Sequence, residues 1–179
     1  MSRSGQVAGV LLAAGAGSRY GMPKVLAEQG QWLRTAVAAL AGGGCDDVVV
    51  VLGAAVVAAP PPARTVIASD WADGMSASLR AGLDAVAGAA YVAIHLVDTP
   101  DIGAEVVSRV LTAATGTGLA RAYFDGRPGH PVVVSAAHAA ALRAELTGDR
   151  GARAYLSGRH DVEAVECGDL ATGADIDTR

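Results

Sequence analysis

Cysteine and lysine are both scarce in this sequence of 179 residues. Cys45 and Cys167 are its two cysteines, and their spacing fits neither a metal-binding motif nor a disulfide framework. This usage favours buried thiols in a reducing cytoplasm. Lys24 is the only lysine among the 14 basic residues, and every other basic side chain is an arginine. A single compact point charge in such a chain is a candidate phosphate contact.

Positive charge and long apolar runs are scarce as well. The 14 basic and 18 acidic side chains leave a formal net charge of −4 without a basic patch, which argues against a nucleic-acid-binding protein. No apolar run approaches the length of a membrane span. The run Val7–Ala14 is short for a signal peptide, and cleavage after it would remove the strand that the next loop needs. We therefore expect a cytoplasmic protein without a membrane partner.

The remaining composition is that of a folded globular protein. Hydrophobic residues make up 51% of the chain and charged residues 18%, which separates it from disordered sequences. Its length is that of one domain with a substantial core. We expect residues 1–179 to form a single domain.

The chain is organised around the stretch Val7–Leu26, which reads V-A-G-V-L-L-A-A-G-A-G-S-R-Y-G-M-P-K-V-L. Its apolar beginning predicts a buried strand, and glycines then follow at positions 15, 17 and 21. Because glycine has no Cβ, the backbone N–H groups of such a loop can approach an anion closely. Arg19 and Lys24 add positive charge. We interpret this loop as one that holds the phosphates of a nucleotide.

Two well-known phosphate loops do not match this stretch. The dinucleotide fingerprint G-x-G-x-x-G requires a glycine where Tyr20 stands, and the next glycine comes one residue late. The Walker loop requires a glycine directly before its lysine, whereas Pro23 precedes Lys24. The second expected strand ends at Gly53 without the acidic residue that a dinucleotide site uses. A dinucleotide-binding oxidoreductase is therefore poorly supported.

The hydrophobic patterns after this loop alternate between helix and strand. Ser76 and Asp101 are predicted to cap helices at their N-termini, and Ser135 is predicted to begin another helix. These patterns predict an α/β fold, a three-layer α/β/α Rossmann-like domain with a mostly parallel central sheet. The expected strands are 7–14, 47–52, 65–68, 91–97, 118–123, 131–134 and 162–167, and the expected helices are 33–41, 76–86, 102–114, 135–146 and a short one after 147–153.

Asp98 follows the strand expected over 91–97 and is a candidate metal ligand. In open α/β sheets, ligands bind beyond the carboxyl ends of the strands. A carboxylate at this position would meet Mg²⁺, the oxygen-liganded ion that accompanies nucleoside phosphates. Two histidines have simpler interpretations, because His95 falls inside the strand as a packed core residue and His130 falls in a turn.

Five separated motifs together resemble one protein family. L-A-A-G-A-G-S-R-Y-G-M-P-K, W-x-x-G-M-S-x-S-L-x-x-G-L, G-x-P-G-H-P, G-D-R-G-A-R and D-I-D-T occur in this order along nearly the whole chain. They resemble nucleotidyltransferases with a Rossmann-like, glycosyltransferase-A type core, and most closely the molybdenum-cofactor cytidylyltransferase branch. The resemblance implies a nucleotide half over about 1–100 and an acceptor half over about 101–179, where Arg150 and Arg153 are candidate contacts of the acceptor phosphate.

The resemblance also implies a set of site residues. Arg19, Lys24 and Asp98 are the expected catalytic residues, and Asp98 and Asp177 are the expected ligands of Mg²⁺. Asp177 lies in the terminal D-I-D-T motif, two residues before the last residue of the sequence. The expected nucleotide contacts are Leu12, Ala13, Ala14, Gly15, Ala16, Gly17, Ser18, Arg19, Lys24, Gly53, Gly74, Ser76 and Ser78.

These residues predict transfer of a nucleoside monophosphate from a triphosphate to an acceptor phosphate, with release of pyrophosphate. An acceptor phosphate is already an anionic nucleophile, so positioning and charge neutralisation suffice without a general base. Ala14 resembles the cytidylyl and uridylyl enzymes, since the guanylyl branch carries another glycine there. We expect CTP and molybdopterin, with contact to a molybdoenzyme or its maturation factor. The alternatives are GTP, ATP or UTP as donor, a sugar phosphate or other small phosphate as acceptor, and a regulatory or chaperone-like protein that binds nucleotide without turnover.

Overall fold

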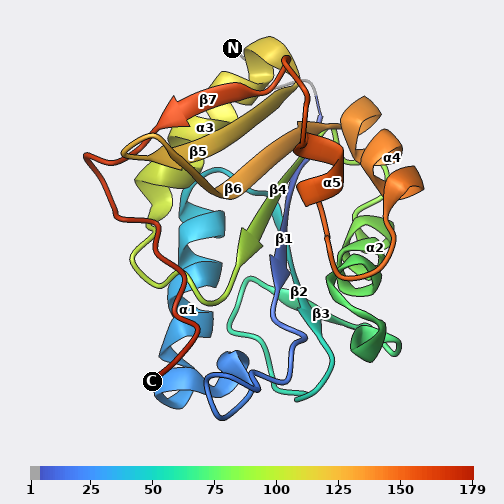
Figure 1. The fold of residues 1–179 in the computed structure, drawn as a ribbon, viewed down its shortest axis with the longest axis vertical. Coiled ribbons are helices and arrows are strands. Elements are labelled where there is room, and N and C mark those ends of the chain that lie inside the picture. The colour runs from blue at the N-terminus through green and yellow to red at the C-terminus, as the bar shows by residue number, and fades with distance from the viewer. Residues whose placement is uncertain (1–4) are drawn as a thin grey trace.

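A seven-stranded sheet runs through the computed structural model, which describes residues 5–179 (Figure 1). The strand order is β3-β2-β1-β4-β6-β5-β7, and β6 alone runs antiparallel to its neighbours. The strands are β1 (Val7–Leu12), β2 (Asp47–Leu52), β3 (Arg64–Ile67), β4 (Tyr91–Leu96), β5 (Leu119–Phe124), β6 (Arg127–Ser135) and β7 (Glu163–Glu166).

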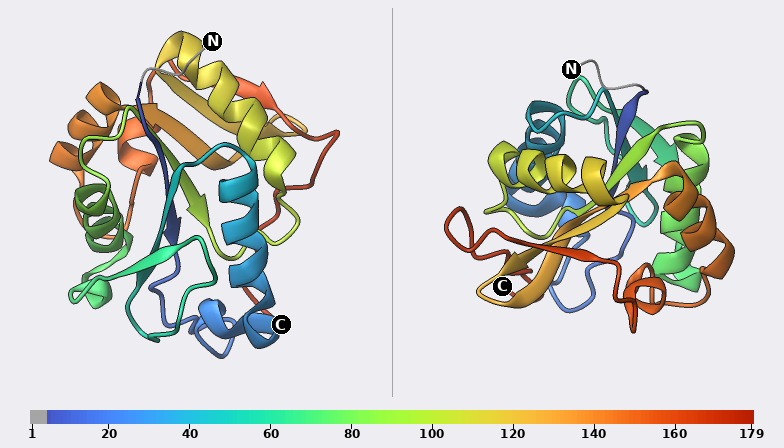
Figure 2. Two further views of the ribbon diagram at one scale, coloured as in Figure 1. Left: turned by 180° about the vertical axis from the view of Figure 1, so that it is seen from behind. Right: turned by 90° about the horizontal axis from the view of Figure 1, so that it is seen from above.

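Helices cover both faces of this sheet, as the views in Figures 1 and 2 show. Helices α1 and α3 pack on one face, and α2, α4 and α5 pack on the other. The α/β prediction with a mostly parallel sheet is thereby confirmed. Among residues 5–179, no helix has the length and apolar character that crossing a membrane requires. The helices are α1 (Ala27–Gly42), α2 (Met75–Ala85), α3 (Ala104–Thr117), α4 (Ala136–Glu145) and α5 (Arg153–Leu156), with the 3₁₀ turns η1 (Lys24–Leu26) and η2 (Trp71–Asp73).

The central strands are buried on both faces, as their continuous apolar sequences predict. Alternate residues of a strand point to opposite faces, so Leu11 and Val50 pack towards α1 and α3. Val10 and Val51 pack towards α2 and α4 instead. Gly82 of α2 lies directly over Val10, and a Cβ at this glycine would overlap the valine side chain. The helix therefore approaches β1 closely, and this approach fixes the first turn of α2 near the end of β1.

The chain leaves β1 and β4 in opposite directions across the sheet. β1 is followed by α1 and then by β2, which lies on one side of β1, whereas β4 is followed by α3 and then by β5, which lies on the opposite side of β4. β1 and β4 are adjacent and parallel, with Leu12 beside Leu96 at their carboxyl ends. Such a reversal of strand order is the usual position of a ligand crevice in open α/β sheets.

Two predicted helix caps are wrong. Gly74 and Gly103 occupy the N-cap positions of α2 and α3, so neither helix is capped by the side chain of its own N-cap residue. Ser76 instead uses its hydroxyl to bind the loop over 147–151, and Asp101 binds a residue of the C-terminal segment. Both side chains thus form hydrogen bonds with residues distant in the sequence instead of capping a helix. The cap by Ser135 is confirmed, because its hydroxyl accepts a hydrogen bond from the amide of His138 in α4.

Three other local expectations can be compared with the structure. Residues 28–30 of α1 have left-handed backbone angles, so the regular part of this helix follows Gly30, close to the expected start at Leu33. His130 lies within β6 rather than in a turn, because β6 extends to Arg127 and pairs there with β5. Cys45 and Cys167 are buried thiols, as their number and spacing suggested.

Candidate nucleotide and metal site

A cavity of about 890 Å³ lies beyond the carboxyl ends of β1 and β4. It is formed by segments that lie far apart in the sequence, including the glycine-rich loop, the start of α2, the end of β4 and the C-terminal segment. Most of the residues singled out in the sequence line it together, namely Leu12, Ala13, Ala14, Gly15, Ala16, Gly17, Ser18, Arg19, Lys24, Gly74, Ser78, Asp98 and Asp177. The fold therefore brings both ends of the chain to one cavity.

The glycine-rich loop presents unpaired backbone amides to this cavity. Within residues 5–179, none of the amides of residues 14–19 donates a hydrogen bond, although all six residues line the cavity. Gly17 gives the loop its shape, since its φ of +66° is left-handed and a Cβ there would overlap the carbonyl oxygen of Met22. The Gly17 carbonyl accepts a hydrogen bond from the Gly21 amide at 2.8 Å. Unpaired amides on a tight glycine loop are suited to bind an anion.

Lys24 connects the two ends of the chain. Its Nζ donates to Asp98 Oδ2 at 2.7 Å and to Asp177 Oδ1 at 3.0 Å. Burial disfavours the charged amine, but the two carboxylates outweigh this effect and raise the pKa of Lys24. The hydrogen bond from Lys24 lowers the pKa of Asp177. The lysine is therefore a fixed positive charge on the cavity wall at neutral pH.

Three carboxylates form a cluster that fits a hard cation. Ligand atoms of Asp98, Asp175 and Asp177 all lie within 4.8 Å of one another. Asp98 Oδ1 is buried without a hydrogen-bond partner among the described residues, and burial raises the pKa of this carboxyl. Carboxylate oxygens in this number are suitable ligands for Mg²⁺ or a similar ion. Asp175 was missed in the sequence, although it lies in the same D-I-D-T motif as Asp177.

Asp177 reaches the cavity because the C-terminal segment returns across the molecule, beside α1 in Figure 1. The amide and hydroxyl of Thr172 both donate to Asp101 Oδ2, at 2.7 and 2.6 Å. Further along, the amide of Ile176 donates to the Asp98 carbonyl at 3.0 Å. Asp98 thus contacts this segment through its backbone as well as through Lys24. These contacts hold Asp175 and Asp177 against the end of β4.

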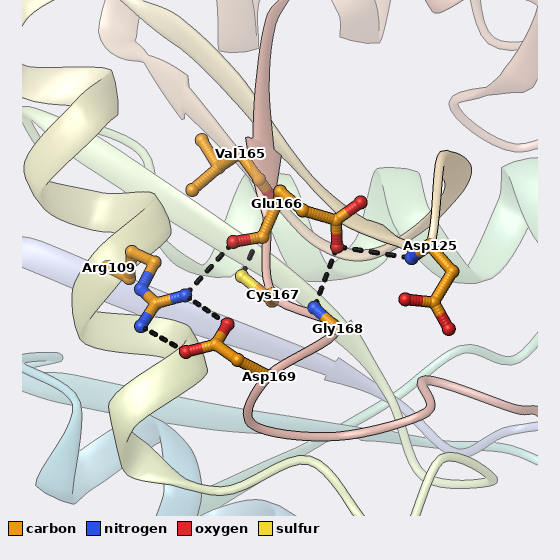
Figure 3. A network of polar contacts seen from close by, with 7 residues as sticks. All are labelled: Arg109, Asp125, Val165, Glu166, Cys167, Gly168 and Asp169. Atoms are coloured by element: carbon orange, nitrogen blue, oxygen red, sulfur yellow. Dashed lines mark hydrogen bonds and ion pairs between the residues drawn. The ribbon is translucent and has the colours of Figure 1, made fainter.

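A second polar network anchors the beginning of this C-terminal segment (Figure 3). The Glu166 carboxylate accepts hydrogen bonds from the amides of Asp125, Gly126 and Gly168, at 3.1, 2.9 and 2.7 Å. The amides of Gly126 and Gly168 contribute most to lowering the pKa of Glu166. Asp125 and Gly126 form the tight turn between β5 and β6, and both have left-handed φ angles. One carboxylate therefore joins this turn to Gly168, two residues after the end of β7.

Arg109 of α3 completes this network. Its guanidinium donates to both carboxylate oxygens of Asp169, at 2.7 and 3.0 Å, and to the Glu166 carbonyl at 3.0 Å. The thiol of Cys167 donates to the Val165 carbonyl at 3.4 Å, and burial raises the pKa of this thiol. None of these residues lines the cavity. Their contacts orient the chain as it leaves β7 towards Thr172.

Gly53 and Ser76 were expected to contact nucleotide, but they lie behind the cavity wall. Gly53 packs against Trp71, and a Cβ at this glycine would overlap the indole. The Ser76 side chain is buried, and its hydroxyl donates to the Thr147 carbonyl at 2.9 Å and accepts from the Gly151 amide at 3.2 Å. These two residues support cavity-lining neighbours.

The N-terminus of α2 is already engaged by the protein itself. The amide of Met75 donates to Asp149 Oδ1 at 2.9 Å, and the amide of Ser76 donates to the Gly148 carbonyl at 3.2 Å. An anion- or ribose-facing role was expected for this helix end. With the loop over 147–151 in this position, the first two amides of the helix are not available to a ligand.

Several cavity residues were not selected from the sequence. Trp71 and Met75 lay within the motif W-x-x-G-M-S-x-S-L-x-x-G-L, but only its glycine and serines were selected. Asp149 lay within the motif G-D-R-G-A-R, but only the two arginines of that motif were selected. Ala72, Leu96, Val97, Arg150 and Arg153 complete the lining. Arg150 and Arg153 are the candidate acceptor contacts of the sequence, and both lie at the cavity.

His95 and His130 lie in different strands, and both are uncharged at neutral pH. His95 is fully buried, as predicted for a core residue, and burial lowers its pKa to about 4. Neither of its ring nitrogens has a hydrogen-bond partner among the described residues. Burial also lowers the pKa of His130, to about 3. Neither histidine lines the cavity.

Comparison with known proteins places this arrangement in a family. The model of the MobA-like NTP transferase domain matches residues 9–164. The chain belongs to the MobA-like NTP transferase domain family. The predicted resemblance to nucleotidyltransferases is therefore confirmed.

A curated relative and two solved structures resemble this MobA-like chain over nearly its whole length. Nicotine blue oxidoreductase of Paenarthrobacter nicotinovorans is 37% identical over 96% of this chain and 92% of its own. The crystal structure of Rv0371c from Mycobacterium tuberculosis H37Rv superposes with a TM-score of 0.81 at 27% identity, covering 98% of this chain and 95% of the other. A manganese complex of Rv0371c has a TM-score of 0.73 at 25% identity, covering 96% and 94%.

Proposed function

We propose that this MobA-like protein transfers CMP from CTP to the phosphate of molybdopterin and releases pyrophosphate. The observation that carries the proposal is the position of Lys24, which is held by Asp98 and Asp177 on the wall of the cavity that the unpaired amides of residues 14–19 also line. An anion site beside a fixed cation and a carboxylate cluster is what phosphoryl transfer requires.

In this proposal the protein acts by positioning and charge neutralisation. The amides of residues 14–19 and the Arg19 guanidinium hold the β- and γ-phosphates of the nucleotide. Lys24 stabilises negative charge that develops on the α-phosphate. The acceptor phosphate attacks as an anion, so no side chain has to remove a proton from it. Residues 1–100 supply most of the nucleotide contacts, and residues 101–179 supply the acceptor side.

The carboxylate cluster would hold a divalent cation. Asp98 and Asp177 are its proposed ligands, with Asp175 as a third, because one carboxylate oxygen of each lies within 4.8 Å of the others and Asp98 Oδ1 has no partner among the described residues. When bound, Mg²⁺ would neutralise part of the negative charge on the phosphates of the nucleotide and the acceptor. The manganese complex of Rv0371c is consistent with a divalent ion in this family. A cytoplasmic location and contact with a molybdoenzyme or its maturation factor stay predictions.

Pyrophosphate release tests this proposal. The protein is incubated with Mg²⁺ and molybdopterin, and CTP, GTP, ATP and UTP are supplied separately. We expect release with CTP, reduced at least roughly a hundredfold by Lys24→Ala, because the lysine acts on transition-state charge. Arg127→Ala removes an exposed basic residue outside the cavity and is the matched control.

The outcomes separate the parts of the proposal. Release with another nucleotide keeps the reaction and corrects the donor. Release with CTP only when a sugar phosphate replaces molybdopterin corrects the acceptor. Nucleotide binding without release under any of these conditions supports the regulatory protein instead.

A second candidate function follows from the relative that is 37% identical over 96% of this chain and is named an oxidoreductase. In this alternative the same cavity would bind a reduced dinucleotide and a dye-like acceptor. The glycine spacing still differs from the dinucleotide fingerprint, which is why we place this alternative second. Oxidation of NADH or NADPH in the presence of nicotine blue, followed by absorbance, tests it directly.

A further inference from the structure

Lys24 bridges the two carboxylates that are the proposed ligands of the divalent cation. Its Nζ lies 2.7 Å from Asp98 Oδ2 and 3.0 Å from Asp177 Oδ1. Ligand atoms of these two aspartates and of Asp175 lie within 4.8 Å of one another. The ammonium and a metal ion would therefore use the same small set of carboxylate oxygens.

The ammonium neutralises this carboxylate cluster only in part. Within residues 5–179, Lys24 is the only basic residue that forms an ion pair with Asp98 or Asp177, and it brings one positive charge to three carboxylates. Asp98 Oδ1 is buried without a hydrogen-bond partner among the described residues. A buried carboxylate oxygen without a partner is costly. The cluster is therefore suited to exchange a single positive charge for a double one.

The hydrogen bonds of Lys24 limit its proposed contact with phosphate. An ammonium has three N–H donors, and Asp98 and Asp177 accept two of them. Lys24 lines the same cavity as the glycine-rich loop, whose amides over 14–19 donate to none of the described residues. While both carboxylates hold the ammonium, it can offer a phosphate in this cavity only one N–H group.

The local structure allows Lys24 to change partners by turning its side chain alone. Its backbone is anchored, because Val25 is buried in the core and the Leu26 amide donates to the Pro23 carbonyl at 2.9 Å. The lysine side chain is a flexible four-carbon stem, and here it borders the cavity. The ammonium can therefore leave the two aspartates while the loop keeps its fold.

A divalent cation is a stronger partner for these carboxylates than the ammonium. It carries twice the charge and coordinates carboxylate oxygens directly. A cation and an ammonium that share a carboxylate also repel each other. Both effects favour separation of Lys24 from the cluster when the cation binds.

We infer that Lys24 and a divalent cation compete for Asp98 and Asp177, and that Lys24 turns into the cavity when the cation binds. Lys24 keeps its charge and changes only its partners. Without the cation, the two carboxylates withhold the lysine from phosphate, and with the cation all three N–H donors are available. The competition requires only that the cluster binds a divalent cation. The use of the released ammonium on a nucleotide rests on the proposed function.

The single lysine of the chain makes this exchange directly measurable. In protein labelled uniformly with ¹³C and ¹⁵N, the lysine Cε signal comes from Lys24 alone. The protein is titrated with Mg²⁺ in the absence of nucleotide, and NMR relaxation of this Cε group is measured at each step. Backbone amide shifts of residues 96–98 and 175–177 report how far the cluster is occupied. We expect the Cε order parameter to fall from a rigid value to below about 0.6 as Mg²⁺ binds, because the ammonium loses both of its anchors.

Lys24→Met and Arg150→Met form a matched pair for the cation affinity of the cluster. Both remove one positive charge from the cavity wall, and of the two residues only Lys24 forms ion pairs with the aspartates of the cluster. Calorimetry with Mn²⁺ should show roughly tenfold tighter binding to Lys24→Met, because no charge-assisted hydrogen bonds have to be broken first. Arg150→Met should bind Mn²⁺ as the wild type does. If Lys24→Met does not fold, the Mg²⁺ titration of the wild type decides the question alone.

Three results would overturn the competition. The first is a Lys24 order parameter that stays constant or rises while Mg²⁺ saturates the cluster, because cation and ammonium would then share the carboxylates. The second is equal Mn²⁺ affinity of the wild type and Lys24→Met. The third is a wild type that binds neither Mg²⁺ nor Mn²⁺.

Pyrophosphate release distinguishes this failure from failure of the proposed function. Release of pyrophosphate by a protein whose Lys24 stays ordered in Mg²⁺ keeps the proposed function and rejects the competition. A Lys24 that Mg²⁺ releases, in a protein without turnover under any of the conditions above, keeps the competition and rejects the proposed function.

Discussion

The cluster around Lys24 and the network around Glu166 are both built from acidic and basic side chains at the ends of strands. They differ in how many of their hydrogen-bond donors and acceptors have a partner within the protein. Around Glu166, the carboxylate accepts three backbone amides, and Arg109 matches both oxygens of Asp169. At the cavity, Asp98 Oδ1 has no partner among the described residues, and the amides of residues 14–19 donate to none of them.

This difference suggests a criterion that distinguishes charged groups that stabilise the fold from charged groups that can bind a ligand. A polar group that is buried without a partner costs stability, so a fold keeps it where a ligand can supply the missing contact. The network around Glu166 is complete without a ligand and serves to anchor the C-terminal segment. The cluster around Lys24 and the glycine-rich loop still have hydrogen-bonding capacity for a cation and an anion. Four substitutions can break or sharpen this contrast.

The largest expected effect is that of Asp98→Asn on activity. Removing this carboxylate should lower kcat by roughly a hundredfold or more, because it acts on charge in the transition state. The free energy of unfolding should change by no more than about 1 kcal/mol, since Lys24 retains Asp177 as a partner. Pyrophosphate release and chemical denaturation measure the two quantities.

Asp169→Asn is the matched control for this change. It makes the same chemical change in the network around Glu166, where Asp169 is the exposed ion-pair partner of Arg109. Its kcat should remain within about twofold of the wild type, because surface ion pairs contribute little and Asp169 lies outside the cavity. A large loss of activity in this variant, with stability unchanged, would show that the contrast between the two regions is wrong.

Substitution of His95 tests whether every buried group without a hydrogen-bond partner belongs to the functional site. Its pKa of about 4 in the folded protein lies below the unfolded value of 6.5, so the unfolded chain takes up the proton first as the pH falls. Stability should therefore decrease by about 3 kcal/mol between pH 6.5 and pH 4 through this group. His95→Leu should remove this part of the pH dependence and retain activity, because the residue does not line the cavity.

Denaturation of His95→Leu and the wild type at a series of pH values provides the measurement. His130 has its own acid sensitivity, and charge on His95 helps to lower the pKa of His130, so the difference between the two proteins is assigned to His95 together with its effect on His130. Equal pH dependence of the two proteins would contradict the neutral state of His95. Loss of activity in a stable variant would connect this buried ring to the site.

A smaller effect is expected from Thr172→Val, which loosens the contact between the C-terminal segment and Asp101. The variant loses the 2.6 Å hydroxyl bond to Asp101 and the 3.3 Å bond that the Ala174 amide donates to this hydroxyl, but it keeps the backbone bond to Asp101. We expect about 1 to 2 kcal/mol of destabilisation, since one hydrogen bond usually contributes about 1 kcal/mol. Hydrogen exchange should become faster over 172–177, and kcat should fall less than in Asp98→Asn.

Thr112→Val provides the comparison for this variant. The Thr112 hydroxyl also donates one hydrogen bond, to the Ser108 carbonyl on the exposed surface of α3. This control should leave exchange over 172–177 and kcat as in the wild type. Equal exchange rates in the two variants would mean that Asp101 does not hold the segment.

The smallest expected effect is the pH dependence contributed by Glu166. Its carboxylate has a lowered pKa because backbone amides bind the charged form. Its stabilisation is present at pH 7 and is lost as the pH falls below the ordinary value of 4.5 and through the folded pKa. Glu166→Gln should therefore be less stable than the wild type at pH 7, and the difference should shrink in acid. A difference that is independent of pH would exclude this role of the charge.

The glycine-rich loop and the central strands could be predicted from the sequence because their signals are local. Residues 48–52 form an unbroken apolar run that favours a strand buried on both faces, and the structure has the strand Asp47–Leu52 there. The loop after β1 contains its glycines at the positions where the backbone needs them, such as Gly17 with its left-handed φ. Asp98 was predicted for a similar reason, since it directly follows a strand.

The errors arose where a distant segment competed with a local preference. Ser76 has the residue type of a helix cap, but Thr147 and Gly151 bind its hydroxyl. Asp101 has the same capping tendency, and Thr172 binds its carboxylate. Neither partner is adjacent in the sequence, so capping rules could not anticipate them.

The sequence by itself determined the α/β pattern, the family and a glycine-rich loop followed by the only lysine. These depend on residue types within a few positions of one another. The tertiary structure decided that Asp175 and Asp177 meet Asp98, and that Lys24 lies between two of these carboxylates. The physical reason is that the protonation and the hydrogen bonds of a buried charged group depend on its neighbours, and folding brings these neighbours from distant parts of the chain.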